Sequence, residues 1–248
     1  MLSATLRENL LCEPSYSKQG VVFRMKLVLR IGGSVVASPL NPALLSRYAD
    51  LLMKLKRKGH TVAAVVGGGS LARETINVAK KMGLKEPEQD EAAISASRLV
   101  AQLLLMKLGE KGTGKIPMSI EEATDLVKSG KVVVMGGLKP GMTTDAVAAM
   151  LAEQISADLL IKATDQEGIY TRDPRKYPDA RKLDALSFDD LTLYFEKDKH
   201  EAGIHQVLDP EAVRILRERK KRAIVLNGFN PDNVFSAVSG ESVGTLIE

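Results

Sequence analysis

Short apolar runs alternate along the chain with longer stretches in which apolar residues recur at helical spacing. The apolar runs cover residues 26–31, 61–66, 131–135, 157–163, 223–227 and 245–247. The helical stretches between them cover residues 42–58, 70–81, 91–108, 119–129, 148–155, 187–195 and 210–222. Strands that are buried on both faces have continuous apolar sequences, and helices between them form the crossovers of a parallel sheet. The alternation therefore predicts an α/β fold, a three-layer αβα sandwich with a mainly parallel central sheet.

Glycine-rich turns follow three of the predicted strands. They have the sequences Gly-Gly-Ser at 32–34, Gly-Gly-Gly-Ser at 67–70 and Gly-Gly-Leu-Lys-Pro-Gly at 136–141. Glycine lets the backbone turn sharply and approach a ligand closely. Because the carboxyl ends of parallel strands meet at one edge of a sheet, we expect the three turns to converge on a shared ligand site.

The last of these turns leads into a helix that has an acidic residue in its first turn. Thr143 or Thr144 is placed to cap this helix, whose free N–H groups favour an anion. The helix dipole stabilises Asp145 there, which is sufficient reason for an isolated aspartate. The repetition of strand, glycine turn and helix favours a functional role instead. We then expect Asp145→Asn to cut turnover severely and to leave the fold nearly as stable, because the amide still caps the helix.

Two further candidates stand near helix starts. Arg73 lies in the first turn of the helix after the triple glycine, where a cation opposes the helix dipole. A phosphate in the glycine loop would make this arginine favourable, because its planar fork grips phosphate, but an ordinary surface arginine fits equally well. Asp90 is expected to cap the helix at 91–108, with ribose binding as the alternative. Asp209, which precedes Pro210, is expected to be a helix cap.

The composition limits the kinds of molecule that the protein is expected to bind. The 248 residues are 44% apolar, which suits one large α/β domain. We place this domain at residues 25–248, after an N-terminal extension of residues 1–24 that is expected to be poorly ordered and dispensable. A net charge of only +4, 4% aromatic residues and no tryptophan argue against nucleic-acid binding. No apolar run is expected to approach the ~20 residues of a membrane span, and the single cysteine, Cys12, suits a cytoplasmic location.

Neither a catalytic nucleophile nor a metal site is indicated. His60, His200 and His205 share no metal-ligand spacing, and no Ser-His-Asp or Cys-His set can be nominated. Several phosphate-type loops without a nucleophile are typical of phosphoryl transfer, which depends on positioning and charge neutralisation rather than on covalent chemistry. The motifs therefore predict a phosphotransferase that acts on anionic small molecules.

Five motifs, in order along the chain, resemble the uridylate kinase branch of the amino acid kinase superfamily in its archaeal form. They are Ile-Gly-Gly-Ser at 31–34, the triple glycine at 67–69 with Leu71 and Arg73, Pro-Gly at 140–141 with Thr-Thr-Asp-Ala-Val-Ala-Ala at 143–149, Thr164 with Gly-Ile-Tyr at 168–170 and Asp-Pro at 173–174, and Gly-Thr-Leu-Ile at 244–247. The resemblance covers roughly nine tenths of the chain. It implies MgATP-dependent conversion of UMP into UDP in pyrimidine nucleotide biosynthesis, without a phosphoenzyme and by a cytoplasmic homohexamer.

The resemblance also implies roles for individual residues. The ATP side would be formed by Gly33, Ser34, Gly69, Arg73, Thr164, Asp165, Tyr170 and Asp173. The UMP side would be formed by Gly68, Asp90, Leu138, Lys139, Pro140, Gly141, Met142, Thr143 and Thr144. Asp145 would order the cations and the metal around the transferring phosphoryl group, with Arg30 and Lys162 neutralising phosphate. Arg73 would grip a phosphate of either the donor or the acceptor.

Three departures from the family pattern bear on these roles. Many members have lysine at the position of Arg30, and arginine changes the reach of the charge. Lys162 stands where bacterial uridylate kinases have a lysine. The turn that is usually Val-Asp-Gly is Gln-Glu-Gly at 166–168, after Asp165, where archaeal members often have asparagine. Two other functions stay open: a related kinase of acetylglutamate, carbamate or isopentenyl phosphate, and a non-catalytic ATP-binding oxyanion storage protein of the same fold.

Overall fold

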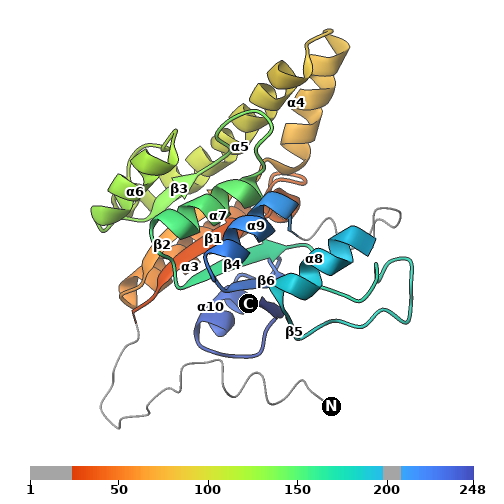
Figure 1. The fold of residues 1–248 in the computed structure, drawn as a ribbon. Helices are drawn as coiled ribbons and strands as arrows, with labels where there is room; N and C mark the ends of the chain where they lie inside the picture. Colours follow the sequence, from red (N-terminus) through yellow and green to blue (C-terminus); the bar gives the residue numbers. More distant parts are fainter. Residues whose placement is uncertain (1–23, 198–207) are drawn as a thin grey trace.

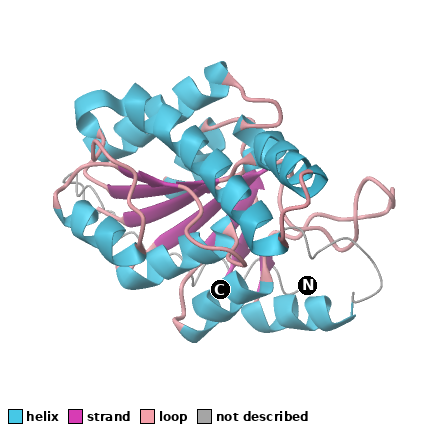
Figure 2. Ribbon diagram, turned by 90° about the horizontal axis from the view of Figure 1, so that it is seen from above, coloured by secondary structure: helices cyan, strands magenta, loops and turns pink. Residues whose placement is uncertain are grey.

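A seven-stranded sheet forms the centre of the computed structural model, which describes residues 24–197 and 208–248 (Figures 1 and 2). The strand order is β3-β2-β1-β4-β6-β7-β5. The strands are β1 Lys26–Ile31, β2 Thr61–Val66, β3 Val133–Met135, β4 Leu159–Thr164, β5 Ala185–Leu186, β6 Ala223–Asn227 and β7 Thr245–Ile247. All neighbours are parallel except β6 and β7. The predicted α/β fold is confirmed, whereas β5 and the antiparallel direction of β7 were not predicted.

Helices cover both faces of this sheet (Figure 2). They are α2 Gly33–Val36, α3 Pro42–Arg57, α4 Gly69–Lys81, α5 Glu86–Leu108, α6 Ile120–Lys128, α7 Thr144–Gln154, α8 Phe188–Lys197, α9 Pro210–Glu218 and α10 Asp232–Val238, with a 3-10 turn at Gly109–Lys111. One core lies between the sheet and α3, α5 and α10. The other lies between the sheet and α6, α7, α8 and α9. The predicted three layers are therefore present.

The side chains of β1 show how the sequence divides these two cores. Leu27, Leu29 and Ile31 point into the core under α3 and α5. Val28 points into the core under α7. Since side chains alternate along a strand, Arg30 shares the face of Val28. The alternation places a charged side chain beneath α7, near the carboxyl end of a central strand.

The start of α5 differs from its prediction. The helix begins at Glu86 and its N-cap is Lys85, so Asp90 lies inside the helix and is not its cap. Pro87 falls in the first turn, where proline is tolerated because the N–H groups there have no partner within the helix. The polar stretch that suggested a loop is therefore the exposed first turn of a longer helix.

This helix also changes the expectation about membrane spans. Among the described residues, 86–111 is the one helical stretch long and apolar enough to cross a membrane, with a mean hydropathy of 1.3. The stretch packs against α3, α4, β2 and β3, and its Val100, Ala101 and Leu104 are fully buried. It is therefore a core helix of the domain. Together α4 and α5 project beyond the sheet as a pair (Figure 1).

The glycine turns converge at the carboxyl edge of the sheet, as predicted. β1, β2 and β3 run in the same direction, so their following turns lie at the same edge. The first two turns touch: a Cβ on Gly33 would lie 2.2 Å from the Gly69 nitrogen. Gly69 has a φ of +58°, which side chains rarely adopt. Both glycines are required by this close approach.

Candidate active site

Three charged residues lie beneath the start of α7, and we call them the charge cluster: Arg30, which is partly buried, and the buried Asp145 and Lys162. Arg30 and Lys162 are register partners on the neighbouring strands β1 and β4. Arg30 Nε lies 2.6 Å from Asp145 Oδ1, as an ion pair rather than a directed hydrogen bond. Lys162 Nζ donates to Asp145 Oδ2. The cluster carries one more cation than anion, so it can neutralise an incoming phosphate.

Burial and charge act in opposite directions on Asp145. Burial raises the pKa of its carboxyl group, but the charges of Arg30 and Lys162 and the hydrogen bond from Lys162 together hold that pKa below the usual value. For Lys162, burial lowers the pKa, as does the charge of Arg30, against the opposing effect of Asp145. Asp145 is therefore ionised at neutral pH, and Lys162 loses its proton more readily than an exposed lysine.

Hydroxyl groups at the start of α7 connect this cluster to the neighbouring helix. Thr143 is the N-cap, and its Oγ1 accepts a hydrogen bond from the Ala146 N–H at 3.0 Å. Thr143 Oγ1 also donates to Asp209, which caps α9 as predicted. Arg30 Nη2 donates to Thr144 Oγ1 at 2.9 Å. Asp145 is thus free of the capping role and serves the two cations instead.

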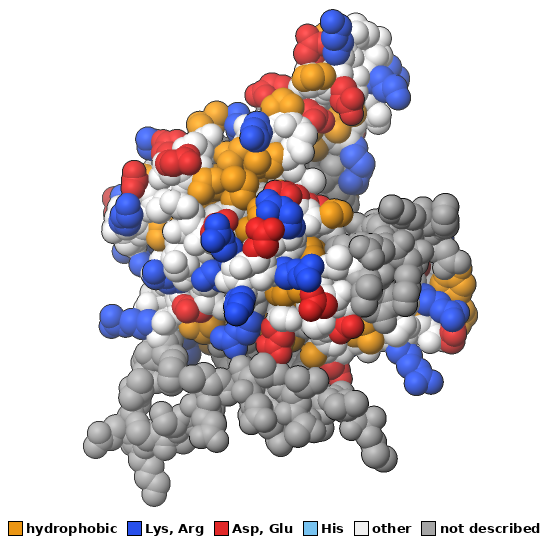
Figure 3. All heavy atoms as spheres, in the orientation of Figure 1, with side chains coloured by type: hydrophobic (Ala, Val, Ile, Leu, Met, Phe, Trp, Pro, Cys, Tyr) orange, Lys and Arg blue, Asp and Glu red, His pale blue; other side chains and the backbone are white. Residues whose placement is uncertain are grey.

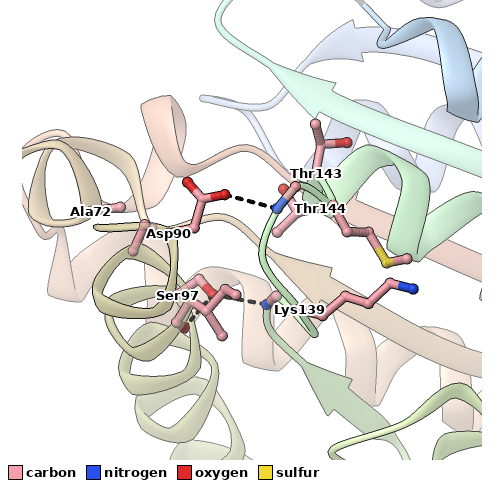
Figure 4. Close-up of a pocket in the computed structure, with 12 residues that line it drawn as sticks. Ala72, Asp90, Ser97, Lys139, Thr143 and Thr144 are labelled. Atoms are coloured by element: carbon pink, nitrogen blue, oxygen red, sulfur yellow. Dashed lines mark hydrogen bonds between the residues drawn. The ribbon is translucent and has the colours of Figure 1, made fainter. Parts of the chain in front are cut away.

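A cavity of about 350 Å³ lies between α5 and the turn after β3 (Figure 4). Its lining residues are Gly68, Ala72, Asp90, Ala93, Ile94, Ser97, Gly137, Lys139, Gly141, Met142, Thr143 and Thr144. Seven of the nine residues predicted for the UMP side line it, and Leu138 and Pro140 do not. Asp90 points from α5 to the turn, where its Oδ2 accepts from the Gly141 N–H at 2.8 Å (Figure 4). Most of the residues predicted for the UMP side therefore line one space.

Sequence reasoning missed the contribution of α5 to this wall. Ser97 Oγ donates to the Ile94 carbonyl and accepts from the Gly137 N–H at 2.8 Å. Arg98 donates to the carbonyls of Gly137 and Leu138 at 3.0 and 2.9 Å. No local signal marks these two residues, because they stand in a helix with the composition of a core helix.

The residues predicted for the ATP side divide into two groups. Gly33, Ser34 and Gly69 lie at the contact between the first two glycine turns, and Arg73 Nη2 donates to Ser38 Oγ at 3.1 Å beside them. Of the remaining ones, Thr164 is the last residue of β4, and Asp165, Tyr170 and Asp173 follow it. Asp173 accepts hydrogen bonds from the backbone and side chain of Arg175. The structure brings the first group to the glycine turns, and it gives Asp173 a partner within its own loop.

A second cavity, of about 500 Å³, lies at the opposite end of the strands. It is lined by Met53, Lys56, Arg57, Glu110, Lys111, Gly130 and Lys131. These residues precede β2 and β3, whereas the glycine turns follow them. The smaller cavity is therefore the one that adjoins the charge cluster, through Thr143 and Thr144.

Comparison with known proteins shows the family to which the chain belongs. The model of the amino acid kinase family matches residues 25–227. The uridylate kinase of Methanocaldococcus jannaschii is 41% identical over 226 residues, which are 90% of this chain and 100% of that protein. The uridylate kinase of Methanothermobacter thermautotrophicus is 38% identical over 223 residues, with 90% and 99% covered.

Solved structures are similar as well. The crystal structure of uridylate kinase from Archaeoglobus fulgidus has a TM-score of 0.81 and 38% identity, and the match covers 90% of this chain and 100% of that one. The UMP kinase from Bacillus anthracis has a TM-score of 0.76 at 23% identity, covers 91% and 97%, and shows the shared fold.

Proposed function

Because the chain belongs to the amino acid kinase family, we propose that it acts as a UMP kinase, which converts UMP and ATP into UDP and ADP. Its relatives named uridylate kinase match over nine tenths of the chain and nearly their whole length. The activity belongs to pyrimidine nucleotide metabolism. The predicted enzyme class, a phosphotransferase, agrees with these relatives.

The charge cluster is the observation that carries the chemistry. A phosphate oxygen of UMP attacks the γ-phosphorus of ATP in line, and the bond from that phosphorus to the β–γ bridging oxygen breaks as ADP leaves. Negative charge on the transferring group is met by Arg30 and Lys162, which Asp145 holds side by side on rigid strands. Such preorganised charge is usually the largest single contribution to the rate.

The two substrates are assigned to the two sides of this cluster. ATP phosphates would lie at Gly33, Ser34 and Gly69, where backbone N–H groups of the glycine turns approach closely. UMP would fill the 350 Å³ cavity, with Asp90 beside its ribose. Arg73 stands near the first two turns and would grip phosphate. Because these turns are assigned to ATP, the location of Arg73 favours a phosphate of the donor, ATP.

Magnesium would enter with ATP as part of that substrate. In such sites the ion keeps several waters and is bound by substrate phosphates with one or two carboxylates. Within the described residues no group of three acidic, histidine or cysteine side chains is placed to hold a metal. Thr143, Thr144 and Ser34 offer hydroxyl oxygens near the glycine turns. This donor set suits an ion that the phosphates carry.

An ADP-release assay tests the function directly. Purified protein with MgATP is offered UMP, CMP, acetylglutamate, carbamate or isopentenyl phosphate, one at a time. Turnover with UMP and slower turnover with CMP is the expected result. Failure with UMP and turnover of another acceptor would identify a different kinase. ATP binding without turnover, together with bound oxyanion found by metal analysis, would identify a storage protein.

Self-association is also proposed, with a hexamer as the predicted assembly. Leu99, Leu103 and Met106 are 53%, 37% and 68% exposed and lie at helical spacing on one side of α5. Hydrophobic side chains gather over this part of α5 in Figure 3. An apolar stripe of this kind commonly marks an interface. Leu103→Glu should yield a smaller species in analytical ultracentrifugation, and an unchanged size would contradict this interface.

A further inference from the structure

The turn after β3 has few hydrogen bonds of its own. Within residues 136–142, the Met142 N–H donates to the Lys139 carbonyl at 3.2 Å. The other partners come from α5: Ser97 and Asp90 accept from the N–H groups of Gly137 and Gly141. Side chains of α5 therefore decide the shape of this turn.

Arg98 makes the only contacts from α5 that hold carbonyl groups of the turn, among the residues the structure describes. Its Nε donates to the Gly137 carbonyl and its Nη2 to the Leu138 carbonyl. Two successive carbonyls thus point at one guanidinium group. Hydrogen bonds from a charged donor are roughly twice as strong as neutral ones. These contacts fix the orientation of two successive peptide planes.

The orientation of these two peptide planes determines which backbone groups lie on the other side of the turn. In a trans peptide the N–H group points opposite to the carbonyl, and the one cis bond among residues 24–197 and 208–248 is Ser38-Pro39. The N–H groups of Leu138 and Lys139 therefore point away from Arg98. Neither donates to another group in the described parts of the chain. The turn thus has two available donors on the side away from the guanidinium.

We propose that Arg98 is a positioning residue that sets acceptor specificity, an inference that rests on the proposed function. Gly137 and Lys139, on either side of these peptide units, line the cavity assigned to UMP. Uracil has a carbonyl oxygen where cytosine has an amino group. A free carbonyl beside the cavity would accept a hydrogen bond from the amino group of cytosine, whereas the Gly137 and Leu138 carbonyls are already held by Arg98. By drawing the carbonyls to itself, Arg98 makes the wall suit uracil.

Arginine is required for this arrangement because of its shape. Its side chain is 19% exposed, and its third contact is with Glu91, 3.9 Å from Nη1. The guanidinium is a rigid fork that reaches both carbonyls at once, whereas a lysine ammonium is a point charge on a flexible stem. The supporting residue also stands on a long helix, which keeps its position constant.

Steady-state kinetics of Arg98→Ala and Arg98→Lys test the proposal. For Arg98→Ala we expect KM for UMP to rise on the order of 10- to 100-fold, as for the loss of hydrogen bonds from a charged group. KM for ATP should stay within about twofold, and the ratio of kcat/KM for UMP to that for CMP should fall on the order of tenfold. Arg98→Lys should lie between Arg98→Ala and the wild type. Arg214→Ala is the matched control, because Arg214 pairs with Glu211 and Glu218 on its own helix.

The outcomes separate this inference from the proposed function. A wild-type protein that does not phosphorylate UMP refutes the function, whatever the variants do. A wild-type protein that does so, with an Arg98→Ala variant of unchanged KM and unchanged UMP preference, refutes the role of Arg98 alone. A rise in KM for ATP equal to that for UMP also refutes it, because it would indicate that both substrate sites are disturbed. If Arg98→Ala fails to fold, Arg98→Lys decides: wild-type values there would overturn the requirement for a fork.

Discussion

Replacing Asp145 by asparagine removes the only negative charge from the charge cluster. The Asp145 and Lys162 side chains are 8% and 5% exposed, and Arg30 Nε lies 2.6 Å from the carboxylate. Asparagine would leave two cations side by side with little access to water. Breaking a buried ion pair by removing one partner costs about 3–5 kcal/mol, and we expect this loss in the free energy of unfolding. The expectation that the variant would stay nearly as stable is revised, because Thr143 caps the helix.

Turnover should fall by a factor on the order of 10²–10³, the usual effect of losing one preorganised electrostatic group. Chemical denaturation followed by circular dichroism measures the stability, and the ADP-release assay measures the rate. Lys162→Met is the matched second variant. It removes one cation and leaves a balanced Arg30–Asp145 pair.

A double variant distinguishes the effect of an unbalanced charge in the cluster from general destabilisation by the substitution. Asp145→Asn with Lys162→Met leaves a single buried cation, so it should unfold less easily than Asp145→Asn alone while remaining inactive. If Asp145→Asn unfolds within about 1 kcal/mol of the wild type and keeps near-normal turnover, the reasoning about the cluster is wrong. A double variant less stable than both single ones would contradict the charge argument.

Three further predictions follow from the structure and one from the sequence. The pKa of Lys162 is lowered by burial and then by Arg30, so turnover should decline on the alkaline side below pH 10.5, and Lys162→Arg should move this decline upward; a profile flat to pH 10.5 would contradict it. Burial, and then the charge of Lys58, lowers the pKa of His60 from 6.5, so the stability it contributes is present above that pH and is lost as the pH falls through the lowered value. Melting temperatures should show this loss in the wild type and not in His60→Gln. Gly33→Ala should abolish activity, because its Cβ would lie 2.2 Å from the Gly69 nitrogen; a crystal structure with the turns unmoved would refute this. Residues 1–23 lie outside the described residues, and the sequence predicts that deleting residues 1–24 leaves solubility and turnover intact; loss of either would show that the extension is needed.

The strongly periodic parts of the fold could be predicted from the sequence. β1, β2, β6 and β7 have the predicted bounds, because each is a short apolar run with clear turn residues around it. The start of α5 could not be predicted, because lysine is an unusual cap and the polar first turn is similar to a loop. β5 has only two residues and owes its place to pairing with β7.

The candidate site shows the same limit. Asp145 could be nominated from the repeated pattern of strand, glycine turn and helix, whereas Arg30 and Lys162 could be nominated from the resemblance to a family. Arg98 could not, because its partners lie 39 and 40 residues further along the chain and its own neighbours are those of a core helix. A contact with a distant backbone carbonyl has no signature in the local pattern.

The separation of the cations from the acceptor wall has a consequence for how new activities could arise on this scaffold. Arg30 and Lys162 stand on two central strands, whereas α5, β3 and the following turn belong to one continuous stretch, residues 86–144. That stretch is one contiguous segment of sequence and can be exchanged as a unit. A chimaera that exchanges it for the equivalent segment of another family member would change the molecule that receives the phosphoryl group, while the chemical step stays with the host.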